Sequence, residues 1–180
     1  MISLSDRHKA LCQRIANDAP IVLSPPILEK DWLITEMIAA LSTLSSKETQ
    51  LVFCGGTCLS QAYHIIDRMS EDVDFKIMVP IGISRGHKDR ILSGFKHQVV
   101  KALQDSGFIL EADSLRARNE NSYIVGTFLY KSRFASSESA LRTGIKLELT
   151  ANTPLTDCAP VPYVRWLSGW RRDTFLSLTL

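Results

Sequence analysis

The sequence predicts an α/β (α+β) domain built on a small mixed β-sheet flanked by helices. Short segments that are wholly apolar, or that alternate apolar and polar residues, have the character of strands. These segments are residues 51–54, 72–78, 108–111, 122–130 and 143–150. Longer segments repeat apolar residues every three or four positions, as one face of a helix does. These are residues 6–17, 27–41 and 84–106. Because both kinds are interleaved along the chain, we expect helices to pack on the sheet.

Length and composition narrow the class of protein. The chain has 180 residues and 45% hydrophobic residues, which suits one folded domain and excludes a disordered chain. No apolar run is long enough to cross a bilayer, and the first residues lack the pattern of a signal peptide, so we expect a cytoplasmic protein. Lys and Arg total 21 against 19 Asp and Glu, a net charge of +2 that neither requires nor excludes nucleic acid.

The chain divides into three expected segments. Residues 1–26 form an N-terminal helix and a proline-containing linker that starts at Asn17. Residues 27–152 form the core, and its first helix is mainly scaffold. Several prolines follow Thr150 without a convincing helical period, so residues 153–180 are expected to be an irregular or truncated tail.

A glycine turn is the first candidate for a binding function. The apolar strand at 51–54 leads into Gly55, Gly56 and Thr57, and a helix is expected over 58–67. Glycines let a backbone approach a phosphate closely, and a helix N-terminus offers free N–H groups. Thr57 could cap that helix or hydrogen-bond a phosphate oxygen. Alone the signal is weak, because most Gly-Gly pairs are simply turns.

A pair of carboxylates on one strand is the second candidate. Asp72 and Asp74 are two residues apart in an alternating segment, so both side chains project from one face. Close carboxylates repel each other unless a cation lies between them, and Mg²⁺ held by carboxylates and substrate phosphates would remove that conflict. The alternative for an isolated Asp-x-Asp is a polar edge strand that faces water.

A later strand supplies a third carboxylate. Glu148 lies opposite Ile145, Leu147 and Leu149 in the segment 143–150. If the two strands are neighbours, Asp72, Asp74 and Glu148 can converge and hold two metal ions about 4 Å apart, as in nucleotidyl transfer. Lys146 shares the face of Glu148 and could contact a phosphate, although a solvated lysine explains it equally well.

Two linked motifs resemble those of the AbiEii/AbiGii toxin family of nucleotidyltransferases: FCGGTCLS at 53–60 and RMSEDVDF at 68–75. Tyr63 fits the family's intervening helix. The segment EKDW at 29–32 resembles one that opens a helix in the family, and IKLEL at 145–149 resembles its later acidic strand. The resemblance covers about residues 25–152.

The resemblance implies a nucleotidyltransferase fold of the DNA polymerase β type. It further implies transfer of NMP from an NTP to an acceptor such as tRNA, in a toxin–antitoxin or abortive-infection system, with Mg²⁺ as cofactor and an antitoxin as partner. By position, Gly55, Gly56 and Thr57 would cradle the triphosphate. Asp72, Asp74 and Glu148 would be the catalytic, metal-binding acids, with Lys146 on the nucleotide. Arg68 and Ser70 also match the motif.

Other functions remain open. The helical C-terminal part usual in the family has no counterpart, so the alternative is a truncated, non-catalytic remnant that binds nucleotide or an antitoxin. A glycosyltransferase would explain the two aspartates but not the glycine turn or Glu148. Basic residues could line an RNA groove, although a solvated helix face is their ordinary explanation. They are Arg85, Lys88, Arg90, Lys96, Lys101, Arg116 and Arg118.

Overall fold

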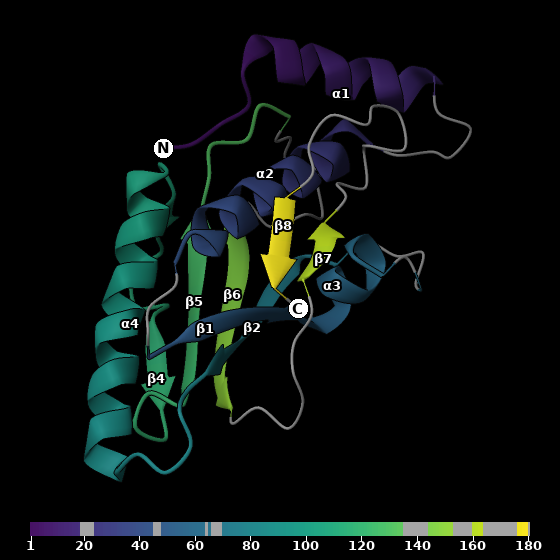
Figure 1. Ribbon diagram of the computed structural model, residues 1–180. Helices are drawn as coiled ribbons and strands as arrows, with labels where there is room; N and C mark the ends of the chain where they lie inside the picture. Colours follow the sequence, from purple (N-terminus) through teal and green to yellow (C-terminus); the bar gives the residue numbers. More distant parts are fainter. Residues whose placement is uncertain are drawn as a thin grey trace.

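A six-stranded mixed sheet forms the centre of the molecule (Figure 1). This computed structural model describes residues 1–18, 24–44, 48–63, 65, 70–134 and 144–151, and the backbone of 152, 160–163 and 176–179. The strands are β1 (Gln50–Cys54), β2 (Asp72–Met78), β3 (Ile109–Leu110), β4 (Arg116–Arg118), β5 (Tyr123–Leu129) and β6 (Gly144–Asn152). Their order is β1-β2-β6-β5-β3, and β4 also pairs with β5. Among the strands of the described residues, β2 and β6 alone run parallel, which confirms the expected mixed sheet.

Two helices, α2 (Pro25–Ser42) and α4 (Arg85–Asp105), cover one face of this sheet. Strand residues on that face are buried in one core with them, as Phe75 of β2 and Leu147 of β6 are, each 2% exposed. The predicted helix 84–106 is confirmed to within a residue at each end. Ser84 caps it by accepting a hydrogen bond from the His87 N–H, and Gly107 follows it with φ +90°.

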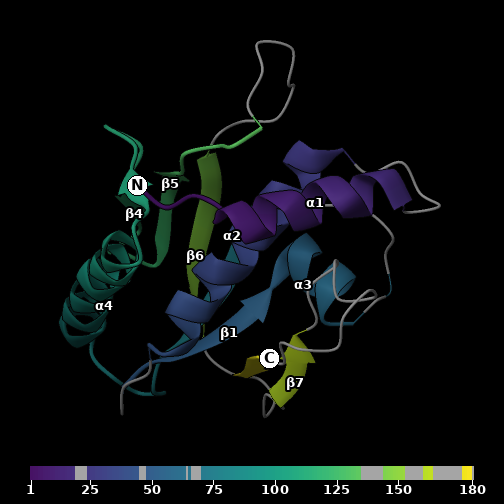
Figure 2. The ribbon, with the colours of Figure 1, turned by 90° about the horizontal axis from the view of Figure 1, so that it is seen from above.

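The N-terminal helix α1 (Asp6–Asp18) packs across α2, as Figure 2 shows from above. A second, smaller core joins the two helices through Leu4, Cys12, Ile15 and Leu28. The linker predicted over 17–26 is wrong at its end, because Pro25 and Pro26 are the first residues of α2. Proline suits that place, since its missing N–H would have no partner in the first helical turn. Residues 19–23 lie outside the described part.

The glycine turn differs from the prediction. The short helix α3 (Gly55–Gln61) begins directly after β1, so the glycines belong to its first turn. The chain changes direction at Gly55, whose φ of +78° is easily reached only by glycine. The helix predicted over 58–67 ends at Gln61, and 64 and 66–69, including Arg68, lie outside the described residues.

The segment expected to be an irregular tail contains two short strands, β7 (Pro160–Tyr163) and β8 (Leu176–Thr179). They pair antiparallel, and β8 lies beside β1 at the edge of the main sheet (Figure 1). Among the helices of the described residues, none combines the length and the apolar character that crossing a bilayer requires.

Candidate active site

The parallel pairing of β2 with β6 brings the predicted carboxylates together. Asp74 lies directly opposite Glu148, and Asp72 lies opposite Lys146. Residues opposite each other in neighbouring strands share a face of the sheet, so all four side chains project from the face that α2 and α4 leave uncovered. Convergence of these residues, which depended on the two strands being neighbours, is therefore observed.

Lys146 lies between two of the acids. Its Nζ is 3.9 Å from Asp72 Oδ2 and forms an ion pair with Glu148 Oε1. The hydrogen bond to Glu148 raises the pKa of Lys146, so the amine stays protonated. The side chains of Asp72, Lys146 and Glu148 are 50%, 41% and 24% exposed. A phosphate group of a substrate could therefore reach the ammonium group from solvent.

Asp74 is the acid whose protonation is most affected by its surroundings. Burial, together with the charges of Glu148 and Asp72, raises its pKa. On its other side the carboxylate lies against Gly55, where any Cβ would overlap it. Gly55 therefore has two roles in the structure: it turns the chain, and it leaves the space that Asp74 occupies.

The other two residues of the turn are placed differently from each other. Gly56 is half-buried in the first turn of α3. Thr57 is fully buried, and its hydroxyl donates a hydrogen bond of 2.5 Å to the main-chain oxygen of Asp72. Thr57 thus fastens α3 to the start of β2, whereas the N-cap position of the helix belongs to Cys54. A phosphate contact from Thr57 remains a prediction, and it would have to come from its main-chain N–H.

Tyr123 of β5 is a member of the site that the sequence did not reveal. Its hydroxyl hydrogen-bonds to Glu148; burial and the Glu148 charge raise the tyrosine pKa, so the phenol is a donor at neutral pH. Glu148 is therefore held from two sides, by Tyr123 and by Lys146. The alternation of 122–130 placed Tyr123 on a strand, but only the pairing of β5 with β6 shows which face it shares.

The donor atoms present are of the chemical kind that a divalent cation takes, although their arrangement is not that of a formed metal site. Three carboxylates are the hard oxygen ligands that Mg²⁺ prefers, and the ammonium of Lys146 already supplies positive charge between two of them. In the described part of the chain, no three His, Cys, Asp or Glu side chains have a ready metal-binding arrangement. Cys54 and Cys58 do not add ligands, because burial raises the pKa of each thiol to about 11 and keeps it protonated.

A buried polar cluster of α2 supports the site from behind. Lys30 is 1% exposed and forms an ion pair with Glu71, the residue before Asp72. Asp31 accepts a hydrogen bond of 2.5 Å from Gln61, the last residue of α3. Through these two contacts α2 is attached to both the helix and the strand that carry the candidate site.

Glu29, beside them, serves a different part of the chain. Its carboxylate accepts hydrogen bonds from the Ser132 hydroxyl and, at 2.7 Å, from the Arg133 main-chain N–H. Those residues follow β5, so Glu29 fixes the path of the chain as it leaves the sheet. Residues 29–31 of the segment 29–32, which resembles the family, thus attach α2 to other parts of the chain.

The sequence of the chain matches a known protein family. Residues 39–176 match the family described as nucleotidyl transferase AbiEii toxin, type IV TA system. The chain belongs to the AbiEii family. The match spans β1 to the start of β8 and includes the glycine turn and all three carboxylates. No curated protein sequence matches the chain significantly.

Solved structures agree with the fold. The chain resembles MenT4, a nucleotidyltransferase toxin from Mycobacterium tuberculosis H37Rv, with a TM-score of 0.56 and 16% identity. That similarity covers 96% of this chain and 54% of MenT4, so the chain spans about half the length of that toxin. A weaker similarity, with a TM-score of 0.37 and 16% identity, is found to the Cid1 poly(U) polymerase bound to Mg and 3′-dATP, over 82% of this chain and 37% of that one. The similarity to MenT4, together with the family match, shows that the AbiEii chain has the nucleotidyltransferase fold.

Proposed function

We propose that this AbiEii-family chain is a metal-dependent nucleotidyltransferase that moves NMP from an NTP to an acceptor such as tRNA. The observation that carries the proposal is the register of β2 and β6, which sets Asp72, Asp74 and Glu148 on one open face beside Gly55. The family description adds the setting of a toxin–antitoxin system. A cognate antitoxin and a cytoplasmic location, where NTPs and tRNA are found, complete the proposal.

The residues of the site have distinct tasks in this reaction. The acceptor hydroxyl oxygen bonds to the α-phosphorus, the bond from that phosphorus to the pyrophosphate breaks, and the hydroxyl proton passes to solvent. Gly55 and Gly56 would offer the main-chain N–H groups of the first turn of α3 to the triphosphate. Lys146 offers a positive charge to a phosphate oxygen from the same face.

Asp72, Asp74 and Glu148 are the residues that would hold Mg²⁺. When bound, the metal would neutralise the charge of the phosphates and of the leaving pyrophosphate. Tyr123 keeps the Glu148 carboxylate oriented by donating a hydrogen bond to it. Thr57 fixes the main chain at Asp72, so the acids and the glycine turn keep one relative position.

The test is transfer of label from each α-labelled NTP to total tRNA in the presence of Mg²⁺. Asp72→Ala should lower the transfer by about 10²-fold or more. It removes one of the three carboxylates that would hold the metal, which stabilises the negative charge developing on the phosphates. Asp18→Ala, an exposed carboxylate at the end of α1, is the matched control and should leave transfer unchanged.

The other outcomes separate the alternatives. NTP binding without transfer to any acceptor would favour a non-catalytic domain that binds nucleotide or an antitoxin. Equal transfer by the wild type and Asp72→Ala would contradict the assignment of the site.

A further inference from the structure

Strand β4 carries two arginines onto the face of the candidate site. Glu148 pairs with Val125 of β5, and Val125 pairs in turn with Arg116 of β4. In the next row, Tyr123 pairs with Arg118. Because residues opposite each other share a face, Arg116 and Arg118 project from the same side of the sheet as Glu148.

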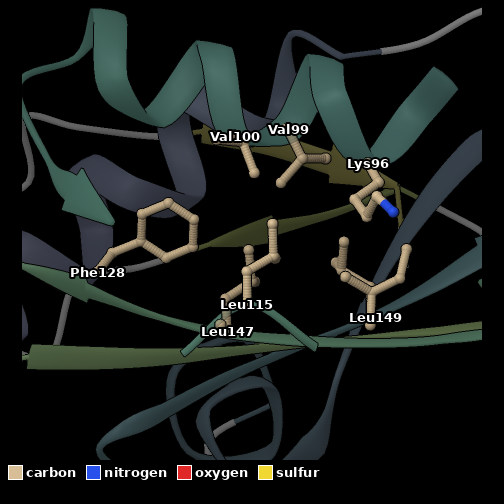
Figure 3. A pocket seen from close by; sticks show the side chains of 9 residues that line it. Lys96, Val99, Val100, Leu115, Phe128, Leu147 and Leu149 are labelled. Atoms are coloured by element: carbon tan, nitrogen blue, oxygen red, sulfur yellow. The ribbon is translucent and has the colours of Figure 1, made fainter. Parts of the chain in front are cut away.

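Leu115, the residue that directly precedes β4, supports this orientation. Leu115 points to the opposite side, where it lines a small apolar cavity with Val99 of α4 and Leu147 of β6 (Figure 3). Side chains alternate along a strand, so Arg116 and Arg118 point away from α4. Both residues are exposed.

These arginines differ from most of the basic residues of α4. Arg85 forms an ion pair with Glu120, Lys101 pairs with Asp105, and Lys96 donates a hydrogen bond to Asn121. Among the residues that the structure describes, no carboxylate forms an ion pair with Arg116 or Arg118. Three of the five basic residues considered on α4 therefore have polar partners within the chain, and α4 packs on the face of the sheet opposite the acids.

The geometry of attack at the α-phosphorus determines which part of the substrates would lie near these arginines. This step rests on the proposed function. In-line displacement requires the attacking hydroxyl to lie opposite the leaving pyrophosphate. The glycine turn, where the pyrophosphate is expected, lies on the β1 side of Asp74. The acceptor must then approach from the β6 side, which continues through β5 to β4.

We infer that Arg116 and Arg118 bind the phosphate backbone of a single-stranded polynucleotide whose terminal hydroxyl is the acceptor. Neighbouring strands are about 4.8 Å apart, so β4 lies roughly 10 Å from β6, beside the place where the acceptor would enter. Two residues along β4 span about 6.6 Å, which suits contacts to successive phosphates of one strand. Arginine adds the forked hydrogen bonding that phosphate groups favour.

The experiment measures binding of the full chain to a fluorescent single-stranded RNA, and to DNA of the same sequence, over a range of salt. The double variant Arg116→Gln with Arg118→Gln should weaken binding of the preferred strand at least tenfold at low salt. The slope of log affinity against log salt should become shallower by about 1.4, since two phosphate contacts are lost. Affinity for NTP should not change.

A second double variant, Arg14→Gln with Arg90→Gln, is the matched control, because it removes the same charge from exposed positions on α1 and α4. It should bind the polynucleotide nearly as the wild type does. The inference would be overturned if both double variants lost the same affinity for the polynucleotide, or if the β4 variant kept the wild-type salt slope. It would also be overturned if the wild type bound neither RNA nor DNA.

Transfer assays separate this inference from the proposed function. If the wild type labels RNA, the β4 variant should raise the KM for RNA and leave the KM for NTP unchanged. If no transfer occurs but polynucleotide binding still depends on the two arginines, the proposed function fails and the binding surface stands. Label that appears on a protein acceptor, with no polynucleotide bound, would overturn the surface and retain the transferase.

Discussion

Gly55 shows how strongly a single residue can constrain the site. Replacement by alanine would place a Cβ against the Asp74 carboxylate and force a side chain into φ +78°. We expect Gly55→Ala to lower the free energy of unfolding by about 1–2 kcal/mol from the backbone conformation alone. The rate of transfer should also fall, and by more than the loss of folded protein explains, because the Asp74 carboxylate must move. Urea denaturation and the labelling assay measure the two effects.

Gly94→Ala provides the control for this prediction. Gly94 lies within α4, and a Cβ there meets no atom within 4 Å. That variant should gain about 0.5–1 kcal/mol of stability, since alanine favours a helix over glycine, and should keep its activity. An active Gly55→Ala with wild-type stability would show that the close approach to Asp74 is not required.

At the scale of single residues, the sequence predicts the three acids of the site better than the residues that contact them. Asp72, Asp74 and Glu148 stand out because charged residues alternate with buried ones in each strand. The sequence predicts Thr57 as a helix cap or a phosphate ligand, whereas its hydrogen bond to Asp72 joins residues of different elements and leaves no local signal. Tyr123 was missed because an aromatic residue in a strand is ordinarily explained by packing.

At the scale of elements, α2 is more than a cover for the sheet. Its buried Lys30 pairs with Glu71 immediately before Asp72, so the start of β2 is attached to this helix. We expect Lys30→Met to reduce transfer about tenfold because Asp72 loses this restraint. The free energy of unfolding should change by no more than about 1 kcal/mol, since methionine keeps most of the volume and Glu71, with a side chain 44% exposed, can be hydrated.

A double-mutant cycle tests that coupling. If the ion pair acts as a unit, Glu71→Gln combined with Lys30→Met should cost no more activity than either change alone. Lys101→Met, which breaks the exposed pair with Asp105 in α4, should leave transfer unchanged. Losses that add up fully would mean that Lys30 and Glu71 act separately.

Most elements could be predicted from the pattern of the sequence, and the exceptions have physical causes. Strand β2 was predicted over its full length because Val73, Phe75 and Ile77 alternate with polar residues. Strand β4 was missed because its three residues are all exposed and leave no alternating pattern. The turn after it holds three consecutive residues with positive φ, Asn119, Glu120 and Asn121, and contains no glycine to mark it.

At the scale of the molecule, the sheet separates two kinds of residue. One face packs on α2 and α4 and provides the core, whereas the other presents the acids, Lys146 and the arginines of β4. Alternation in the sequence predicts the two faces of β2 and β6, but not that these strands are neighbours. The parallel pairing of Asp72 with Lys146 joins residues 74 positions apart (146 minus 72), and no local signal specifies such a contact.

This separation predicts that stability and activity can be changed independently. Leu103 of α4 is fully buried in the core and belongs to the helix layer away from the acids. Leu103→Ala should lower the free energy of unfolding by about 2–5 kcal/mol, because it removes buried methyl groups and leaves a cavity. Below its unfolding transition, the variant should keep the wild-type KM for both NTP and RNA.

The arginine variants of β4 should behave in the opposite way, with a wild-type free energy of unfolding and a raised KM for RNA. Urea denaturation and the labelling assay at one low temperature compare both variants directly. If Leu103→Ala raised either KM while still folded, α4 would have to position the open face as well as cover the core. The two faces of the sheet would then act as one coupled unit. The effect of the β4 arginines on the KM for RNA could not be separated from the effect of the helix layer.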